Sequence, residues 1–221
     1  MRAIVFANGL MTDAAAEARA WVRSGDLVVA VNGGSSHVIA AGLVPDHLIG
    51  DLDSLPDEIQ ERCRVGGTVV HRAPVDKDET DLELALAWVV TQPAVDEIVV
   101  LGASGGRPDQ ALANLLLLAI SALIGRRVLV ASGNWVTMIV RGGERLDLVG
   151  CPGDRVSLIP LGGSAEGVTT SGLVFPLRGE TLLFGPARGV SNRMVGTTAQ
   201  VVVQQGIVWC FHERRAPDAC S

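Results

Sequence analysis

The chain has 221 residues, of which 48% are hydrophobic and 19% are charged. This composition is ample for a folded core and excludes an intrinsically disordered chain. The formal net charge of −6 and the absence of a long basic run argue against nucleic acid or an anionic membrane as the main partner, because both require a positive surface. A small-molecule substrate fits this charge better.

Strands and helices alternate along the first part of the chain. Short apolar runs predict strands at residues 3–7, 27–31, 48–49, 68–72, 97–101 and 127–131. Helical spacing predicts helices at 13–23, 36–41, 56–64 and 81–90, and a buried helix in the apolar run 111–124, which is too short to cross a bilayer. This alternation favours a doubly wound, mostly parallel sheet with helices on both faces.

The pattern changes after residue 133. Short alternating segments, split by glycine and proline, predict strands at residues 155–160, 172–177, 181–185 and 199–210. We therefore expect two domains: an α/β domain over residues 1–133, and an antiparallel β-sandwich-like domain over residues 134–221.

Two features bear on the cellular compartment. Residues 1–10 hold one arginine and a brief apolar run, without the core or the cleavage pattern of a signal peptide. The cysteines form no CxxC pair and have no zinc-like spacing: Cys63, Cys151, Cys210 and Cys220. We expect reduced, structural thiols in a cytoplasmic protein.

Loops rich in glycine, asparagine and aspartate follow the carboxyl ends of the predicted strands. They contain Asn8-Gly9, Asn32-Gly33-Gly34, Asp51 with Asp53, residues 74–81, residues 102–107 and Ser132-Gly133-Asn134. Ligands of open α/β sheets bind outside this edge, so we expect the loops to converge on one crevice. Each loop taken alone also fits an ordinary turn, since these residue types dominate turns.

Two clusters of carboxylates carry the most specific chemical signal. Gly50-Asp51-Leu52-Asp53-Ser54 follows an apolar strand, and Lys77-Asp78-Glu79-Thr80-Asp81, which contains the only lysine of the sequence, precedes a helix. Magnesium beside a polyphosphate is typically held by one or two carboxylates together with the oxygens of the phosphates. Asp51 and Asp53 repel each other unless a cation or hydrogen-bond donors lie between them. The clusters therefore predict a magnesium and phosphate site.

Some of these residues also have structural explanations. Thr80-Asp81-Leu82-Glu83 matches a helix capping box, and acids at the start of a helix are favoured by the helix dipole. Arg107 stands at the mouth of the helix that follows Gly105-Gly106. It is placed either to meet phosphate near backbone amides or to form a surface ion pair.

The ordered set of motifs resembles the thiamine pyrophosphokinase family nearly from end to end. The motifs are Asn32-Gly33-Gly34, Gly50 to Ser54, Lys77 to Asp81, Gly105-Gly106-Arg107 with Asp109-Gln110, Ser171-Gly172-Leu173, and Val190-Ser191-Asn192 with Gly196. This family transfers a diphosphate from ATP to the hydroxyl of thiamine and releases AMP. The resemblance implies this reaction and its Mg²⁺ dependence for the present chain. It also implies a homodimer whose active site draws on both subunits.

The resemblance assigns roles residue by residue. It implies the catalytic residues Asp51, Asp53, Lys77 and Asp81, of which the three aspartates hold the metal. It implies a nucleotide site formed by Asn32, Gly33, Ser54, Asp78, Thr80, Gly105, Gly106, Arg107 and Asp109. In the last domain it implies that Ser191 and Asn192 contact thiamine. No dedicated general base is evident.

Three positions depart from the family pattern. Asn32 replaces a usual aspartate, Pro108 replaces a usual apolar residue, and Arg193 stands where an acid is common. An arginine beside the expected site for cationic thiamine leaves open a related pyrophosphokinase that acts on a different alcohol. A nucleotide sensor without catalytic turnover, built on the same scaffold, is also open.

A serine hydrolase is the alternative from another class of enzyme. Gly102-Ala103-Ser104-Gly105-Gly106 is a GxSxG motif between a strand and a helix, with His212 and either Asp147 or Asp154 downstream. The β-rich last part of the chain does not supply the parallel units that normally carry the acid and the histidine. This hypothesis also leaves both carboxylate clusters without a role.

Overall fold

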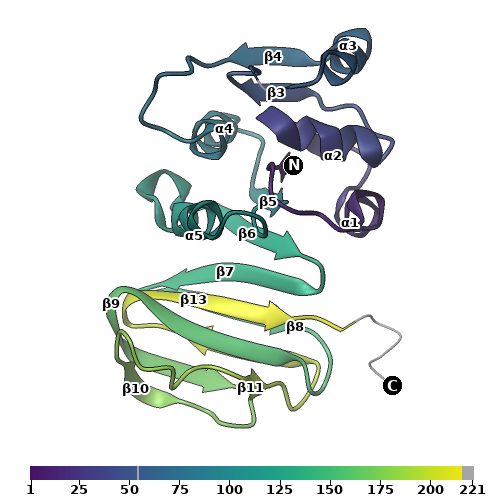
Figure 1. The fold of residues 1–221 in the computed structure, drawn as a ribbon. Helices are drawn as coiled ribbons and strands as arrows, with labels where there is room; N and C mark the ends of the chain where they lie inside the picture. The colour runs from purple at the N-terminus through teal and green to yellow at the C-terminus, as the bar shows by residue number, and fades with distance from the viewer. Residues whose placement is uncertain (54, 216–221) are drawn as a thin grey trace. The chain divides into compact units, whose positions relative to one another are not determined.

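The computed structural model describes residues 1–53 and 55–215 (Figure 1). The chain divides into two compact units, Met1–Gly133 and Asn134–Ser221. The expected fold class is confirmed, since parallel strands with helices form the first unit and antiparallel, sandwich-like strands form the second. Within the described residues, no helix has the length and apolar character needed to cross a membrane.

Parallel strands form the sheet of the first unit, in the order β4-β3-β2-β1-β5-β6 (Figure 1). Their bounds are β1 (Arg2–Phe6), β2 (Leu27–Val31), β3 (His47–Gly50), β4 (Val69–Arg72), β5 (Glu97–Leu101) and β6 (Arg127–Ser132). The central strands are continuous apolar runs because both of their faces are covered. Ile4, Val5 and Phe6 of β1, for example, are 0% exposed.

Helices cover both faces of this sheet (Figure 1). The bounds are α1 (Ala14–Trp21), α2 (Ser35–Ala40) and α3 (Asp57–Val65) on one face, and α4 (Asp81–Val90) and α5 (Pro108–Leu116) on the other. Asp13 Oδ1 accepts from the backbone N–H of Ala16 at 2.8 Å and caps α1. Thr80 Oγ1 accepts from the N–H of Glu83 at 3.2 Å and caps α4. These caps fix where both helices begin.

The buried helix expected over residues 111–124 is wrong in both length and burial. Helix α5 ends at Leu116, and two 3₁₀ turns follow it, η2 (Leu117–Ala119) and η3 (Ser121–Leu123). No residue of α5 is buried, and Leu112 is 53% exposed, whereas buried leucines lie in the two turns. An apolar run shows how much apolar surface a segment has, but not which residues the rest of the fold covers.

A pair of histidines packs beneath α4 at the outer strands of the same sheet. His47 Nδ1 and His71 Nε2 are 3.0 Å apart, on β3 and β4, so one ring donates a hydrogen bond to the other. The ring of Trp88 from α4 lies 4.3 Å from that of His47 and 4.9 Å from that of His71, between centroids. Burial, and then the neighbouring His71, lower the pKa of His47, and Asp46 only partly opposes them.

We expect His47 to make stability depend on pH. Because the folded state lowers the pKa of His47, the unfolded chain binds the proton more readily, so stability is complete above about pH 6.5 and falls as the pH drops below it. Urea unfolding between pH 7.5 and 5 measures this loss. Burial also lowers the pKa of His212, which contributes in the same direction. His47→Gln should therefore lose less stability than the wild type over this range, and equal losses would refute the role of His47.

The long strand β9 (Arg155–Ser171) organises the second unit (Figure 1). Its first half pairs with β13 (Gln205–Glu213), which also pairs with β7 (Trp135–Arg141), and its first two residues pair with β11 (Asn192–Arg193). Its second half pairs with β10 (Arg178–Leu182) and β12 (Thr198–Val202), and β12 pairs with β8 (Arg145–Val149). All these pairings are antiparallel. Gly162, with φ of +71°, lies between the two halves and allows the strand to pass from one sheet to the other.

The strand predictions for this unit are wrong in detail. The segment 172–177 contains an isolated bridge between Leu173 and Met194 instead of a strand. The segment 199–210 holds parts of two strands, β12 and β13. The strand expected at 155–160 continues to Ser171, and that expected at 181–185 is β10, which begins at Arg178. Alternation of apolar residues shows a half-buried segment, but it does not show where a ladder of hydrogen bonds ends.

The expectation of four reduced cysteines is also wrong, because Cys151 is disulfide-bonded. Motif spacing cannot reveal such a bond, which depends on the distance between residues in the fold. Cys63 and Cys210 are free and buried. Burial raises the pKa of the Cys210 thiol to about 12, which leaves it unreactive. Cys220 lies outside the described residues.

Candidate active site

A cavity of about 510 Å³ opens at the carboxyl edge of the parallel sheet. Its walls come from the loops after β1, β2 and β5 and from the starts of α4 and α5. The strand order reverses between β1 and β5: the chain first adds β2, β3 and β4 on one side of β1, and then adds β5 and β6 on the other side. Open α/β sheets bind their ligands at such a switch point. The lining includes Asn8, Asn32, Thr80, Gly105, Gly106 and Arg107.

Four side chains form a compact polar cluster that shares Asn32 and Asp81 with this cavity. Asn32 Nδ2 donates to Asp51 Oδ1 at 2.9 Å and to Asp81 Oδ2 at 3.1 Å, so one amide bridges two carboxylates. Lys77 Nζ lies 2.8 Å from Asp81 Oδ1 and 3.9 Å from Asp51 Oδ2. The side chains of Lys77, Asp51 and Asp81 are 11%, 15% and 20% exposed. We call these four residues the carboxylate cluster.

The cluster is charged, and its members stabilise one another's charges. Partial burial opposes the charge on Asp51, but hydrogen bonds to Asp53 and Asn32 and the nearby Lys77 ammonium outweigh it and lower the pKa of this carboxyl group. The hydrogen bond to Asp81 is the main reason why the pKa of Lys77 is raised. Asp51 and Lys77 are therefore each stabilised in their charged form.

Asp53 lies beside the cluster rather than within it. Its backbone N–H faces Asp51 Oδ1 at 3.4 Å, and its side chain is exposed. Leu52, between the two acids, has φ of +64° and is only 5% exposed. A buried leucine in the left-handed region is unusual, and the strained turn at Leu52 holds Asp51 against Asn32. Ser54, expected in the nucleotide site, lies outside the described residues.

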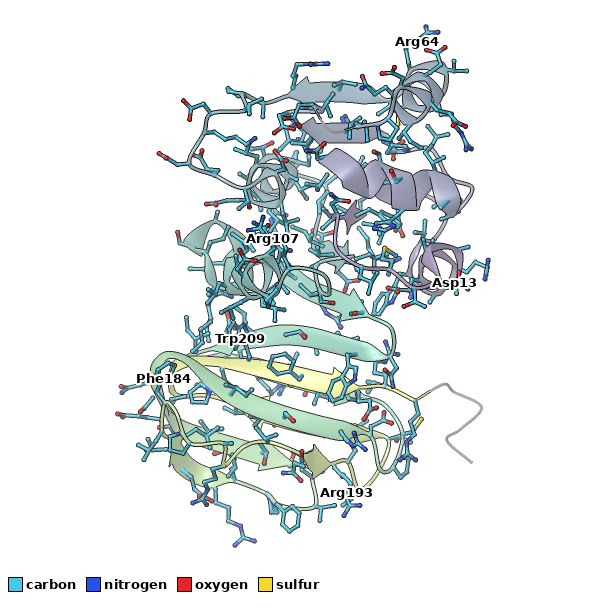
Figure 2. All side chains as sticks on the ribbon, viewed as in Figure 1. Asp13, Arg64, Arg107, Phe184, Arg193 and Trp209 are labelled. Atoms are coloured by element: carbon cyan, nitrogen blue, oxygen red, sulfur yellow. The ribbon has the colours of Figure 1, made fainter. Side chains whose placement is uncertain are left out.

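Among the other residues expected in the nucleotide site, Thr80, Gly105, Gly106 and Arg107 line the cavity. Of the described residues expected there, Gly33, Asp78 and Asp109 are not part of this lining. Gly33 lies in the 3₁₀ turn η1 (Asn32–Gly34), and Thr80 lines the cavity while it caps α4. Gly105 and Gly106 form the turn before α5. Arg107, labelled in Figure 2, lines the cavity and is exposed. Its Nη2 lies 2.5 Å from Asp109 Oδ2. Asp78 is exposed in the loop before α4.

The expected acceptor residues belong to the second unit. The side chain of Asn192 is held by backbone groups: its Oδ1 accepts from the N–H groups of Phe175 and Arg193, and its Nδ2 donates to the carbonyl of Phe175 at 2.7 Å. Ser191 has φ of +64°, and its N–H donates to Ser157 Oγ. Arg193, labelled in Figure 2, is exposed. Asn192 therefore shapes the loop that presents Ser191.

The side chains proposed for a serine hydrolase have other partners. Ser104 Oγ donates to Ser132 Oγ at 2.8 Å. His212 is 2% exposed, and its Nε2 lies 3.3 Å from Asp154 Oδ2 in the interior of the second unit. Asp154 also accepts from the N–H groups of Cys151 and Arg215. A histidine held in this way stabilises the fold and has no exposed edge for a substrate, which argues against a triad.

Sequence reasoning missed three features of the site. It identified Asn32 as a departure from a family pattern, but not as the bridge between Asp51 and Asp81. It placed Gln110 only in a family motif and Asn114 only in the apolar run, and it assigned neither residue to the cavity that both line. Asn114 Nδ2 donates to the carbonyl of Ala103 at 2.8 Å and ties α5 to the loop after β5. Their polarity within an apolar helix was the available signal.

The cluster fits a divalent cation that takes some of its ligands from the protein and the others from a phosphate. Among the described residues, no three His, Cys, Asp or Glu side chains are grouped so that they could hold a metal ion alone. Asp51 and Asp81 supply carboxylate oxygens, and Asn32 Oδ1 is buried without a hydrogen-bond partner in the described part of the chain. Carboxylate and amide oxygens suit magnesium, which commonly takes its other ligands from phosphates and water.

A parallel sheet with a cavity at its switch point, and a cluster of carboxylates and lysine at that edge, is the arrangement of an open α/β protein that binds its ligand at the carboxyl ends of the strands. Sequence models of two domains match the chain: "Thiamin pyrophosphokinase, catalytic domain" over residues 18–127, and "Thiamin pyrophosphokinase, vitamin B1 binding domain" over residues 145–208. The chain belongs to the thiamine pyrophosphokinase family.

Individual relatives agree with this assignment. The chain is 27% identical to thiamine pyrophosphokinase of Bacillus subtilis over 184 residues, which cover 82% of this chain and 85% of that protein. It is 27% identical to thiamine pyrophosphokinase 3 of Oryza sativa over 180 residues, covering 77% of this chain and 67% of that protein. The crystal structure of thiamin pyrophosphokinase from Geobacillus thermodenitrificans matches with a TM-score of 0.84 and 25% identity, covering 100% of both chains.

Proposed function

We propose that this protein transfers a diphosphate group from ATP to the hydroxyl of thiamine, giving thiamine diphosphate and AMP. The observation that carries the proposal is the carboxylate cluster at the rim of the 510 Å³ cavity, in a chain of the thiamine pyrophosphokinase family. The thiamine oxygen forms a bond to the β-phosphorus of ATP, the bond between this phosphorus and the α-phosphate oxygen breaks, and the hydroxyl proton leaves to solvent. AMP is the leaving group.

We propose Mg²⁺ as the metal of this reaction. When bound, it neutralises phosphate charge and makes the β-phosphorus more electrophilic. Asp51 and Asp81 would hold it, with Asp53 beside them. Lys77 contributes a compact positive charge for the transferred phosphates, and Asn32 keeps the two carboxylates together. Positioning and charge neutralisation are the main requirements of phosphoryl transfer, so this cluster suffices without covalent catalysis.

The cavity is the proposed ATP site. Arg107 lies where it can meet phosphate if its ion pair with Asp109 opens, and this pair is exposed and therefore weak. Gly105 and Gly106 line the cavity directly before Arg107, and their backbone amides are further proposed phosphate contacts. Further members of the proposed nucleotide site are Asn32, Gly33, Ser54, Asp78, Thr80 and Asp109.

The second unit is the proposed thiamine-binding domain. Ser191 offers a hydroxyl on a loop that Asn192 holds in shape, and the vitamin B1 binding domain matches this part of the chain. We further propose that the protein acts in the cytoplasm as a homodimer, with the active site at the subunit interface.

The test is formation of AMP from ATP in the presence of purified protein. We expect equal amounts of AMP and thiamine diphosphate, measured by chromatography, with both thiamine and Mg²⁺ required. A panel of other primary alcohols in place of thiamine tests the alternative acceptor that Arg193 leaves open. If another alcohol is diphosphorylated faster than thiamine, that alcohol is the substrate. If the protein binds ATP but forms no AMP with any acceptor, it is a nucleotide sensor.

One variant separates this proposal from the hydrolase. Ser104→Ala removes the hydroxyl of the GxSxG motif and leaves the cluster intact, so AMP formation should continue at the wild-type rate. The variant loses the hydrogen bond from Ser104 Oγ to Ser132 Oγ. Full activity of this variant would show that the Ser104 hydroxyl has no catalytic role.

A further inference from the structure

Lys77 and a divalent cation have the same potential partners. The amide of Asn32 uses one oxygen of each carboxylate, Asp51 Oδ1 and Asp81 Oδ2. The other oxygen of each carboxylate faces Lys77 Nζ, at 3.9 Å for Asp51 and 2.8 Å for Asp81. The ammonium therefore lies at the oxygens that a metal ion would need.

We propose that Lys77 is a place-holding cation that competes with the metal. Its ammonium neutralises Asp51 and Asp81 while no nucleotide is bound, and it moves to the phosphates when the metal takes these oxygens. The proposal rests on the proposed function for the source of the phosphates, which is ATP. This competition makes metal binding weak in the free protein and couples metal binding to nucleotide binding.

Charge within the cluster supports this exchange. Two carboxylates and one ammonium leave one net negative charge, and a dication added without removal of the ammonium would face a cation across the same oxygens. These side chains are 11–20% exposed, so solvent screens their interactions less than at an open surface. ATP brings its own negative charge and gives the ammonium another partner. The ammonium and the metal can then both be paired.

The scaffold allows the exchange without rearranging the acids. Asn32 holds both carboxylates through the oxygens that do not face Lys77, and its bonds do not involve the ammonium. Lys77 lies in the loop between β4 and α4, where its Nζ also donates to the carbonyl of Pro74 at 3.0 Å. The ammonium is thus held by its own loop as well as by the cluster, and its movement requires a change in the side chain and this loop alone.

The test is binding of Mn²⁺ to the free protein, followed by the electron paramagnetic resonance signal of unbound Mn²⁺. Lys77→Met keeps the length of the side chain and removes the charge, and we expect it to bind Mn²⁺ about tenfold more tightly than the wild type, which corresponds to about 1.4 kcal/mol. Lys77→Arg retains a cation and should bind no more tightly than the wild type. Asp81→Asn should bind more weakly.

Arg64→Met is the matched control, because it removes one positive charge from an exposed ion pair with Glu61 in the same unit. It should bind Mn²⁺ as the wild type does. With α,β-methylene ATP present, the advantage of Lys77→Met should disappear, since the ammonium then no longer competes. Wild-type affinity in free Lys77→Met, with circular dichroism showing an intact fold, would overturn the proposal.

This outcome is distinct from failure of the proposed function. A wild-type protein that forms thiamine diphosphate, together with a Lys77→Met variant that binds Mn²⁺ no more tightly, refutes the competition alone. Tighter Mn²⁺ binding by Lys77→Met, together with no AMP formation by the wild type, keeps the competition and refutes the reaction.

Discussion

Replacing Asp51 by asparagine is expected to lower kcat for AMP formation at least about a thousandfold. The substitution keeps the shape of the side chain but removes one of the two carboxylates at the metal position. The new amide nitrogen faces either Lys77 Nζ, which then loses an ion pair, or the amide of Asn32, which then loses a hydrogen bond. Steady-state AMP release and urea unfolding of the same sample measure the rate and the integrity of the fold.

Asp57→Asn provides the control for this variant. Asp57 is an exposed acid in the first turn of α3, the element that follows β3 along the chain, and its replacement removes the same charge. Its kcat should stay within about twofold of the wild type, since surface charges away from special contacts have small effects. Near-normal turnover of Asp51→Asn with saturating Mg²⁺ would contradict the metal assignment.

Replacing Gly34 by alanine is expected to destabilise the protein by about 3 kcal/mol or more. The added Cβ would lie 2.0 Å from the carbonyl oxygen of Phe6 and 2.8 Å from its carbonyl carbon. Both atoms belong to the backbone of the central strand β1, and Phe6 is 0% exposed, so neither can shift without disturbing the sheet. Gly34 ends the turn that carries Asn32, so the same clash disturbs the cluster. The free energy of urea unfolding measures the loss.

Gly196→Ala is the steric control for Gly34→Ala. A Cβ at Gly196 meets no atom within 4 Å, and its backbone does not require a positive φ. Its stability should therefore stay within about 0.5 kcal/mol of the wild type. A Gly34→Ala variant as stable as Gly196→Ala would show that the close approach of α2 to β1 is not as rigid as the packing indicates.

The elements that carry the cluster were predictable because their signals are local. The apolar runs at Leu27–Val31 and Glu97–Leu101 have the predicted bounds, since polar residues end each strand abruptly. Helix α4 begins at Asp81 as predicted, because the hydroxyl of Thr80 caps it within three residues of sequence. Parallel strands then bring their carboxyl ends to one edge, which explains why acids far apart in the chain were expected together.

Other features depend on distances that a sequence does not show. Asn32 is 19 residues from Asp51 and 49 from Asp81, so its bridging amide follows from the packing of η1, β3 and α4 together. The contacts of Lys77 with Asp51 and Asp81 and the disulfide of Cys151 likewise depend on the packing of the fold. In α5, the apolar residues resembled those of a buried helix, but the fold leaves Leu112 and Leu116 largely uncovered. Long-range pairing and coverage by neighbours are properties of the fold rather than of a segment.

The position of the metal ion is the central claim, and anomalous scattering tests it most directly. Crystals grown with Mn²⁺ and α,β-methylene ATP should show an anomalous peak in contact with carboxylate oxygens of both Asp51 and Asp81, with Lys77 Nζ turned from Asp81 toward a phosphate oxygen. A peak held by other residues, with Lys77 still against Asp81 and the nucleotide outside the cavity, would contradict the account.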